Sequence, residues 1–383
     1  MTAQIDPLTA SADVDLAALR ANVATLGALV RPALLMVVVK ADGYGHGMLP
    51  CARAARAAGA DWLGVATPAE ALALREDGDA GPLLAWLYGV DEDLTPLVAA
   101  DVDVSVSTLD QLSHLVGAAA TAERQARVHL KIDTGLSRNG AADTEWDALC
   151  AAAAEAEEVG ALQVVGVWSH LAAADEPGHP SVALQVTAFE DACARARAAG
   201  LRPALRHLAN SAGALVVPEA RYDLVRVGIA AYGVDPAPGL AARAGVVLRP
   251  VMTLRAQLAQ VKDLAAGAGV SYGWTWVAEE PTAVGLVPLG YADGVPRHAS
   301  NRAQVQVAGG RAPVRGRVCM DQLVVELPGP ASIGDEVVLF GPGSAGEPTA
   351  AAWAEWCGTI GYEIVTRVGA RVPRRYRDDE GTP

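Results

Sequence analysis

Two of the three lysines in the chain lie where an amine could take part in chemistry. Lys40 ends the apolar run 34–39 and precedes the glycine-rich segment 41–47, and Lys131 follows Val128-His129-Leu130. Against these three lysines stand 27 arginines, so lysine is used sparingly. A lysine at a partly desolvated strand end favours its neutral form, which is the nucleophilic one. The alternative is a side chain whose long stem only carries its charge out of the core.

The elements that must position these lysines alternate along the first 230 residues or so. Short apolar runs typical of buried parallel strands are separated by alanine-rich helical segments. One helix opens with Thr67-Pro68-Ala69-Glu70, a capping box with proline in the first turn. Eight alternating strands predict a (β/α)8 TIM-type barrel, with an open doubly wound sheet as the alternative. The runs are 34–39, 62–66, 83–87, 102–106, 127–132, 164–168, 205–209 and 224–229.

The pattern changes near residue 245, where helical periodicity gives way to alternating strands separated by Gly and Pro turns. We therefore expect residues 12–245 to form the barrel and residues 246–383 to form a mainly β C-terminal domain. One short helix is expected around 350–356, and the charged end 374–383 is expected to be frayed. The expected strands are 253–261, 282–288, 303–307, 323–327 and 336–340.

Composition narrows the class of protein. The formal net charge of -14 and the pI of about 4.9 argue against nucleic-acid or anionic-membrane partners. No apolar stretch reaches the length of a membrane span, and residues 1–15 contain no Lys or Arg, unlike a signal peptide. Five widely spaced cysteines indicate reduced thiols. We expect a soluble cytoplasmic protein.

Polar residues follow several expected strands, at the end of a barrel where reacting groups gather. Such barrels often bind phosphate after the seventh and eighth strands, where Ser211 offers a hydroxyl and the N–H groups of Gly228 and Ile229 can approach an anion. A phosphate site near a strand-end lysine predicts pyridoxal 5'-phosphate (PLP) held as a Schiff base by such a lysine. The other residues that follow strands are Tyr44, Lys131, Arg138, Ser169, His170 and Asn210, and Arg226 lies within the eighth strand.

Other interpretations of these residues stay open at this point. Segment 43–47 is similar to a dinucleotide-binding loop, but Met48 stands where the third glycine of GxGxxG belongs. His170 could be a hydrogen-bonded core histidine, and Ser211 could cap the helix after the seventh strand. No histidine has metal-ligand spacing to a cysteine or another histidine, so no metal is expected.

Nine motifs taken together resemble those of alanine racemases. They stand in that family's order, cover about residues 12–375 and include several in the β-rich part. This agreement is far more specific than any single motif. The motifs are 37–47, 131–138, 169–176, 207–211, 226–229, 271–273, 290–294, 317–321 and 359–363.

The resemblance implies a role for each matching residue. Lys40 resembles the Schiff-base lysine and Tyr272 the second acid–base residue, while Lys131 resembles a lysine that many members carry as a carbamate. Arg226 is similar to the arginine that faces the pyridine nitrogen, and Arg138 to the one near the substrate carboxylate. The other cofactor-binding residues implied are Tyr44, His170, Ser211, Gly228, Ile229 and Tyr362, and a partner subunit would contribute Tyr272, Tyr291, Met320 and Asp321.

The function implied is that of a cytoplasmic, homodimeric isomerase that interconverts L- and D-alanine by two-base α-proton transfer and supplies D-alanine for peptidoglycan. A serine or broad-specificity racemase of the same fold is the nearest alternative. A PLP decarboxylase on a related barrel is opposed by motifs 271–273 and 317–321, and a non-enzymatic PLP carrier by the long β-rich part.

Overall fold

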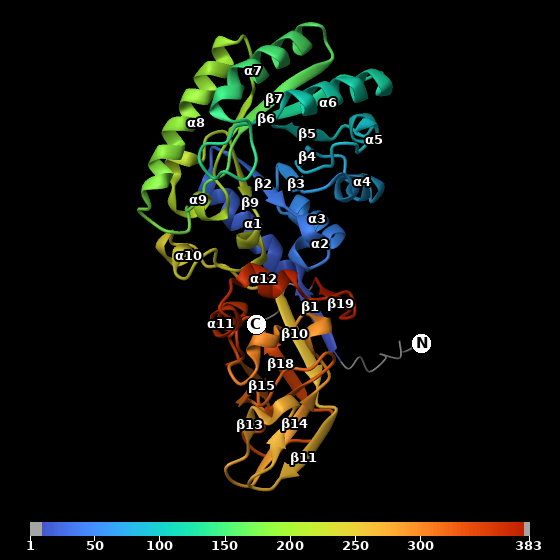
Figure 1. Ribbon diagram of the computed structural model, residues 1–383, viewed down its shortest axis with the longest axis vertical. Coiled ribbons are helices and arrows are strands. Elements are labelled where there is room, and N and C mark those ends of the chain that lie inside the picture. Colours follow the sequence, from blue (N-terminus) through green and yellow to red (C-terminus); the bar gives the residue numbers. More distant parts are fainter. Residues whose placement is uncertain (1–9, 379–383) are drawn as a thin grey trace.

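The computed structural model describes residues 10–378, which form two parts stacked along the long axis of the molecule (Figure 1). The upper part is a barrel of eight parallel strands surrounded by helices, and the lower part is rich in β-strands. This architecture confirms the predicted barrel with a mainly β part after it, and excludes the open doubly wound sheet. No helix within residues 10–378 is long and apolar enough to cross a membrane.

Each barrel strand falls on one of the predicted apolar runs. The strand order is β8-β7-β6-β5-β4-β3-β2-β9. The barrel closes where Asp223 N donates to Arg206 O (3.1 Å) and Arg226 N donates to Ala209 O (3.0 Å). The strands are β2 (Leu34–Val38), β3 (Trp62–Val65), β4 (Leu83–Ala85), β5 (Asp103–Val106), β6 (Ala126–Lys131), β7 (Leu162–Trp168), β8 (Leu205–His207) and β9 (Leu224–Val227).

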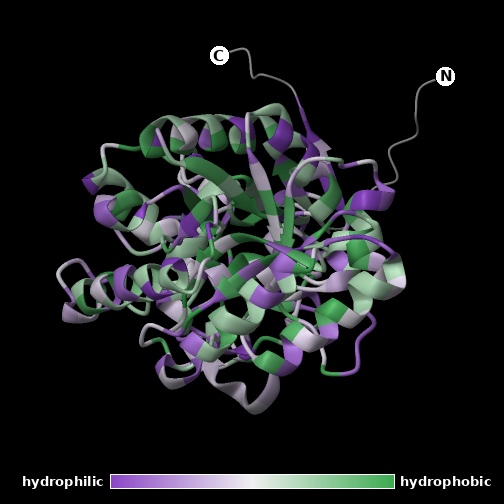
Figure 2. Ribbon diagram, turned by 90° about the horizontal axis from the view of Figure 1, so that it is seen from above, coloured by the Kyte–Doolittle hydropathy of each residue, from purple (hydrophilic) through white to green (hydrophobic). Residues whose placement is uncertain are grey.

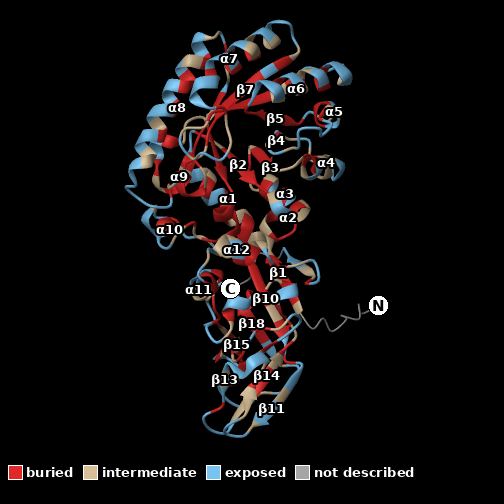
Figure 3. Cartoon of the chain, in the orientation of Figure 1, coloured by how far each residue is buried: buried red, intermediate tan, exposed pale blue. Residues whose placement is uncertain are grey.

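Helices cover the outside of the barrel, and the longer ones have a buried inner face and an exposed outer one (Figure 3). Viewed from above, hydrophobic strands lie inside a ring of helices of mixed hydropathy (Figure 2). Thr67 and Glu70 form the predicted capping box at the start of α4. The helices are α1 (Leu16–Val30), α2 (Lys40–Tyr44), α3 (Met48–Ala57), α4 (Pro68–Glu76), α5 (Thr95–Ala99), α6 (Leu109–Ala122), α7 (Asp143–Glu158), α8 (Pro180–Ala198), α9 (Ser211–Val216) and α10 (Leu240–Arg243), with 3-10 turns η1 (Pro218–Ala220) and η2 (Ile229–Tyr232).

The β-rich part contains a six-stranded sheet, a three-stranded sheet and a two-stranded hairpin. The six-stranded sheet has the order β16-β15-β18-β10-β1-β19 and the three-stranded sheet the order β11-β14-β17. The strands are β1 (Ala10–Asp15), β10 (Met252–Gln257), β11 (Gln260–Leu264), β12 (Gly269–Val270), β13 (Trp276–Val277), β14 (Thr282–Val287), β15 (Gln304–Val307), β16 (Gly310–Pro313), β17 (Leu323–Glu326), β18 (Glu336–Phe340) and β19 (Arg374–Arg377). Helices α11 (Ala350–Cys357) and α12 (Gly361–Thr366) and turns η3 (Tyr272–Trp274), η4 (Tyr291–Asp293) and η5 (Arg297–Ala299) complete it.

Three expectations for this part were wrong in detail. The run 253–261 is two strands, because β10 pairs with β18 whereas β11 pairs with β14 in the other sheet. The segment Arg374–Arg377 is not frayed but pairs in parallel with β1, and the Arg374 side chain donates to the Gly45 carbonyl at 2.9 Å. Helix α12 was not expected. Residues 379–383, also expected to be frayed, lie outside the described residues.

Candidate active site

A cavity of about 560 Å³ opens at the C-terminal ends of the barrel strands, a size typical of small-molecule sites. The structure brings the barrel residues singled out for the site to this one cavity, together with Tyr362 from α12, except Ser169, which does not line it. Two sets of groups meet there. One consists of amines and guanidinium groups, and the other of hydroxyls and backbone N–H groups. The lining residues predicted from sequence are Lys40, Tyr44, Lys131, Arg138, His170, Ser211, Arg226, Gly228, Ile229 and Tyr362.

The backbone after Lys40 makes a left-handed turn, which explains the small residues in this segment. Ala41, Asp42, Gly43 and Tyr44 all have positive φ, between 52° and 61°. For residues other than glycine this conformation costs roughly 1–2 kcal/mol each, so neighbouring groups must hold it. The turn places Lys40 and Tyr44 on the same cavity.

Side chains on both sides of the turn hold it in place. Glu70 accepts from the Ala41 N–H at 2.7 Å, so the residue that closes the capping box also fixes the start of the turn. Asp42 accepts from the Met48 N–H at 2.8 Å. The fully buried His46 ring contacts the carbonyls of Gly43 (3.0 Å) and Tyr44 (2.9 Å) through Nδ1. The lysine is therefore presented by a braced loop.

The cavity is strongly electropositive, because two lysines and two arginines line it and no Asp or Glu of the described chain does. Burial, followed by the charge of Arg138, lowers the pKa of Lys40. Burial and the charges of Arg226 and Arg138 lower the pKa of Lys131 to about 7. Burial and Arg226 also hold the pKa of His170 well below its usual range, so this ring is neutral. The site favours neutral amines and anionic ligands.

Arg226 is fixed by acceptors on its two terminal nitrogens. Nη2 donates to the carbonyls of Ser169 (2.8 Å) and Leu208 (3.0 Å) and contacts His170 Nδ1 at 3.2 Å. Nη1 donates to the His207 carbonyl at 2.9 Å and contacts His207 Nδ1 at 3.2 Å. Its Nε–H has no acceptor among residues 10–378. Burial lowers the pKa of Arg226 to about 9, which leaves it protonated near neutrality.

His170 has a defined orientation and tautomer. Gln185, from α8, donates to the His170 carbonyl at 2.9 Å and to Thr134 Oγ1 at 3.1 Å. Guanidinium groups only donate, so His170 Nδ1 must accept from Arg226 and the proton of the neutral ring lies on Nε2. His170 thus offers an N–H donor on the side away from Arg226.

Tyr44, Gly228 and Ser211 form the other side of the cavity. Ser211 Oγ accepts from the Gly228 N–H at 2.9 Å, and the Tyr44 ring packs against those of Tyr232 (5.0 Å) and Tyr362 (6.4 Å). A Cβ atom on Gly228 would lie 2.2 Å from the Tyr44 hydroxyl oxygen. Only glycine lets that hydroxyl and the β9–η2 backbone meet, as a cradle for a small anion requires.

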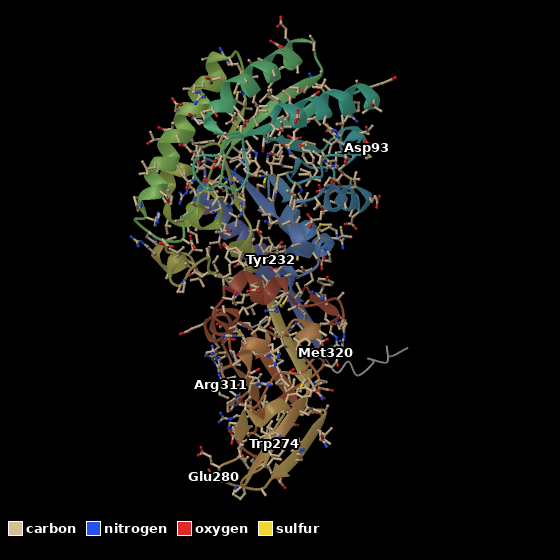
Figure 4. The ribbon with its side chains drawn as sticks, in the orientation of Figure 1. Asp93, Tyr232, Trp274, Glu280, Arg311 and Met320 are labelled. Carbon is tan, nitrogen blue, oxygen red and sulfur yellow. The ribbon has the colours of Figure 1, made fainter. Side chains whose placement is uncertain are left out.

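Four residues assigned to the site do not reach this cavity within one chain. Tyr272, Tyr291 and Met320 belong to the β-rich part and expose 70%, 41% and 53% of their surface. Figure 4 shows Met320 and Trp274 in that lower part, below the barrel. Asp321 is held at the surface by Arg371, which donates to it at 2.8 Å.

Sequence reasoning missed six residues that line the cavity, of which Val38, Ala66 and Leu87 are aliphatic. Trp86 follows β4, Trp168 ends β7, and Asn139 follows Arg138. The Lys131 amine lies 4.3 Å from the centre of the Trp168 ring and donates to Asn139 Oδ1. The place of the two tryptophans at strand ends was the available signal, whereas Asn139 lies in the loop after β6, one residue beyond the motif 131–138.

Models of two protein domains match almost the whole chain. The alanine racemase N-terminal domain matches residues 14–236, and the alanine racemase C-terminal domain matches residues 251–376. The alanine racemase of Streptomyces coelicolor is 55% identical over 375 residues, covering 96% of each chain. That of Frankia casuarinae is 52% identical over 370 residues, again covering 96% of each.

Solved structures give the same picture. The chain is similar to alanine racemase from D-cycloserine-producing Streptomyces lavendulae, with a TM-score of 0.95, 51% identity and 98% of both chains covered. It is also similar to a Bacillus anthracis alanine racemase with bound L-Ala-P, with a TM-score of 0.90, 30% identity and coverage of 97% of this chain and 96% of that one.

Proposed function

The chain belongs to the alanine racemase family and interconverts L- and D-alanine, and we propose that it does so with pyridoxal 5'-phosphate (PLP) held in the barrel cavity. The observation that carries the cofactor assignment is the meeting of Lys40 with an anion cradle in one electropositive cavity. Its product, D-alanine, serves peptidoglycan synthesis. When bound, PLP withdraws electrons from the substrate α-carbon and so acidifies its proton.

The residues of the cavity fit this cofactor. Lys40, whose amine is shifted toward its neutral form, is the residue to hold its aldehyde carbon. Tyr44, Ser211, Gly228, Ile229 and Tyr362, which line the same cavity, would hold its phosphate. Arg226 would turn its unpaired Nε–H toward the pyridine nitrogen, and a protonated guanidinium leaves that nitrogen without a proton of its own.

Two groups move the α-proton on opposite faces of the substrate. Lys40 serves one face from within the barrel. Tyr272 serves the other, and because it lies outside the cavity of its own chain we propose that it comes from a second copy. The Nε2–H of His170 would then donate to the phenolic oxygen of the partner subunit's Tyr272 and favour its phenolate form.

The remaining assignments concern the substrate and the dimer. Arg138, which lines the cavity, would bind the substrate carboxylate. The partner subunit's Tyr291, Met320 and Asp321 would complete the same site. Lys131, with a pKa of about 7, has a neutral fraction that could react with carbon dioxide, and the resulting carbamate would place a negative charge beside Arg138. We place this homodimer in the cytoplasm, on the grounds of its acidic charge and few cysteines.

Substrate preference tests the function directly. The PLP-loaded protein is incubated with L-alanine and L-serine together, and each enantiomer is measured by chiral chromatography. We expect D-alanine to form well ahead of D-serine, and Lys40→Ala to form neither. D-serine in the lead would change the substrate, and a wild-type chain that forms neither product would refute racemisation.

The anion cradle makes a separate prediction. Gly228→Ala should weaken PLP binding by about tenfold or more, because the new Cβ would displace the Tyr44 hydroxyl and the neighbouring N–H groups. Absorbance titration of the cofactor-free protein measures this. Gly117→Ala, in α6, is the control, because nothing lies within 4 Å of a Cβ there and its φ is not positive. Equal PLP affinity in Gly228→Ala and the wild type would contradict the cradle.

A further inference from the structure

A chain of buried polar side chains runs through the barrel interior to Arg226. Asp103 lies on β5, His129 on β6, His207 on β8 and Arg226 on β9. His129 Nε2 contacts Asp103 Oδ2 at 3.0 Å, and His129 Nδ1 contacts His207 Nε2 at 2.8 Å. His207 Nδ1 in turn contacts Arg226 Nη1 at 3.2 Å. We call these four residues the relay.

The relay is sealed from solvent and built into the packing. Its members are at most 4% exposed. The Trp168 ring stacks on His207 with an interplanar angle of 1°, and the Trp62 ring meets His129 edge-on at 5.4 Å. A buried polar network of this kind is stable only when every member has a partner, and here every ring nitrogen has one.

Gly166 lets the two histidines meet. Strand β7 lies between β6 and β8 in the sheet, and Gly166 pairs with His129 on one side and Leu205 on the other. A Cβ atom on Gly166 would lie 2.5 Å from His129 Nδ1, in the place where that nitrogen contacts His207. The missing side chain on β7 is therefore the gap through which the relay passes.

The hydrogen bonds of the relay can point in only one direction. Arg226 is a donor only, so His207 Nδ1 accepts. Burial and neighbouring positive charges hold the pKa of His207 well below its usual range, so the neutral ring carries its proton on Nε2 and donates to His129 Nδ1. His129 then carries its proton on Nε2 and donates to the Asp103 carboxylate.

The far end of the relay is fixed by Arg127. Its Nε donates to Asp103 Oδ1 at 2.6 Å and its Nη2 to Oδ2 at 3.2 Å. This pairing offsets the cost of burying a carboxylate that is 1% exposed. It also holds the Asp103 carboxylate in place as an acceptor for His129.

We propose that Asp103 is a positioning residue of the active site, which acts through His129 and His207 to hold the Nε–H of Arg226 toward the cavity. A reversed relay would turn a His207 Nδ1–H against the N–H groups of Arg226, and two facing donors would force the guanidinium to move. This inference rests on the proposed role of Arg226 at the cofactor nitrogen.

Asp103→Asn tests the direction of the relay while keeping the shape of the side chain. Of the groups around the residue 103 side chain, Arg127 makes the shortest contact, and it can only donate. The amide oxygen of the asparagine will therefore accept from Arg127, and its NH₂ group will face His129. We expect His129 and His207 to move their protons from Nε2 to Nδ1. We also expect an altered absorption spectrum of the bound cofactor and a fall in kcat of about tenfold or more.

Removing Arg127 as well should restore the relay. In Asp103→Asn/Arg127→Met the amide oxygen is free to turn toward His129, so we expect Nε2 protonation and a kcat within about threefold of wild type. A purely structural role would give a double variant at least as impaired as the single one. Asp79→Asn is the control, because Asp79 is paired with Arg56 through two hydrogen bonds (2.8 and 3.1 Å) but lies outside the relay and the cavity.

The protonated nitrogens are read by ¹⁵N NMR of histidine-labelled, cofactor-free protein, independently of catalysis. Wild-type protein with Nδ1 protonated on either His129 or His207 would overturn the proposal without any variant. So would an Asp103→Asn protein with reversed tautomers but an unchanged spectrum and kcat, or a double variant that is not rescued. If the wild type neither binds PLP nor racemises alanine, the proposed function fails, and the direction of the relay is still decided by the cofactor-free spectra.

Discussion

Replacing Tyr272 with phenylalanine is expected to lower racemisation by at least about 100-fold in both directions, because one of the two acid–base groups is lost. Lys40 remains in its barrel, so the α-proton of one enantiomer should still exchange with solvent. Proton NMR in D₂O follows this exchange for each pure enantiomer. The expected result is loss of the α-proton signal from one enantiomer only.

Exchange from one enantiomer only distinguishes a two-base mechanism from a mechanism with a single base. Equal exchange of both enantiomers in Tyr272→Phe would mean that a single group reaches both faces, and the assignment of Tyr272 would be wrong. Tyr222→Phe is the matched control, because its hydroxyl contacts Glu190 at 3.4 Å and the residue does not line the cavity. This control should racemise alanine at the wild-type rate.

Mixing two inactive variants is expected to restore activity. In a dimer of one Lys40→Ala chain and one Tyr272→Phe chain, one of the two sites has both an intact lysine and an intact partner tyrosine. If subunits exchange at random from equal amounts, half of the dimers are mixed, and activity should approach roughly one quarter of wild type. Racemisation is measured as exchange proceeds, with native mass spectrometry to follow the mixed dimer.

The double variant Lys40→Ala/Tyr272→Phe provides the control for this experiment. When it is mixed with either single variant, no combination of chains contains an intact site, so no activity should appear. Mixed dimers of the two single variants without activity would show that the site is not shared between subunits.

The barrel could be predicted because buried parallel strands are continuous apolar runs, and eight of them alternate with helices. The pairing of β1 with β10 and β19 could not be predicted, because these strands lie more than two hundred residues away from Ala10–Asp15 in sequence. Nothing local in a six-residue segment specifies such partners. The same holds for β19, whose arginines suggested a solvated end but bind backbone carbonyls and Asp13 instead.

The residues of the site also differ in whether they could be predicted from the sequence. Lys40, Lys131 and His170 could be found because polar residues at strand ends must meet at one end of a barrel. His129 and Asp103 lie within strands, among apolar neighbours, and only the folded barrel shows that they touch. The position of Gly166 opposite them is likewise invisible in sequence, because its role depends on the strand beside it.

The placement of the lysines also has a consequence for chemical selectivity. An aldehyde condenses with primary amines in their neutral form, and among residues 10–378 only three side chains carry a primary amine: Lys40 and Lys131 in the cavity, and Lys262, exposed on β11. Nearly all other positive charge is guanidinium, which keeps its proton and is a poor nucleophile. A carbonyl reagent that enters this molecule therefore meets almost no competing amine, and the amino-acid composition itself directs it to the cavity.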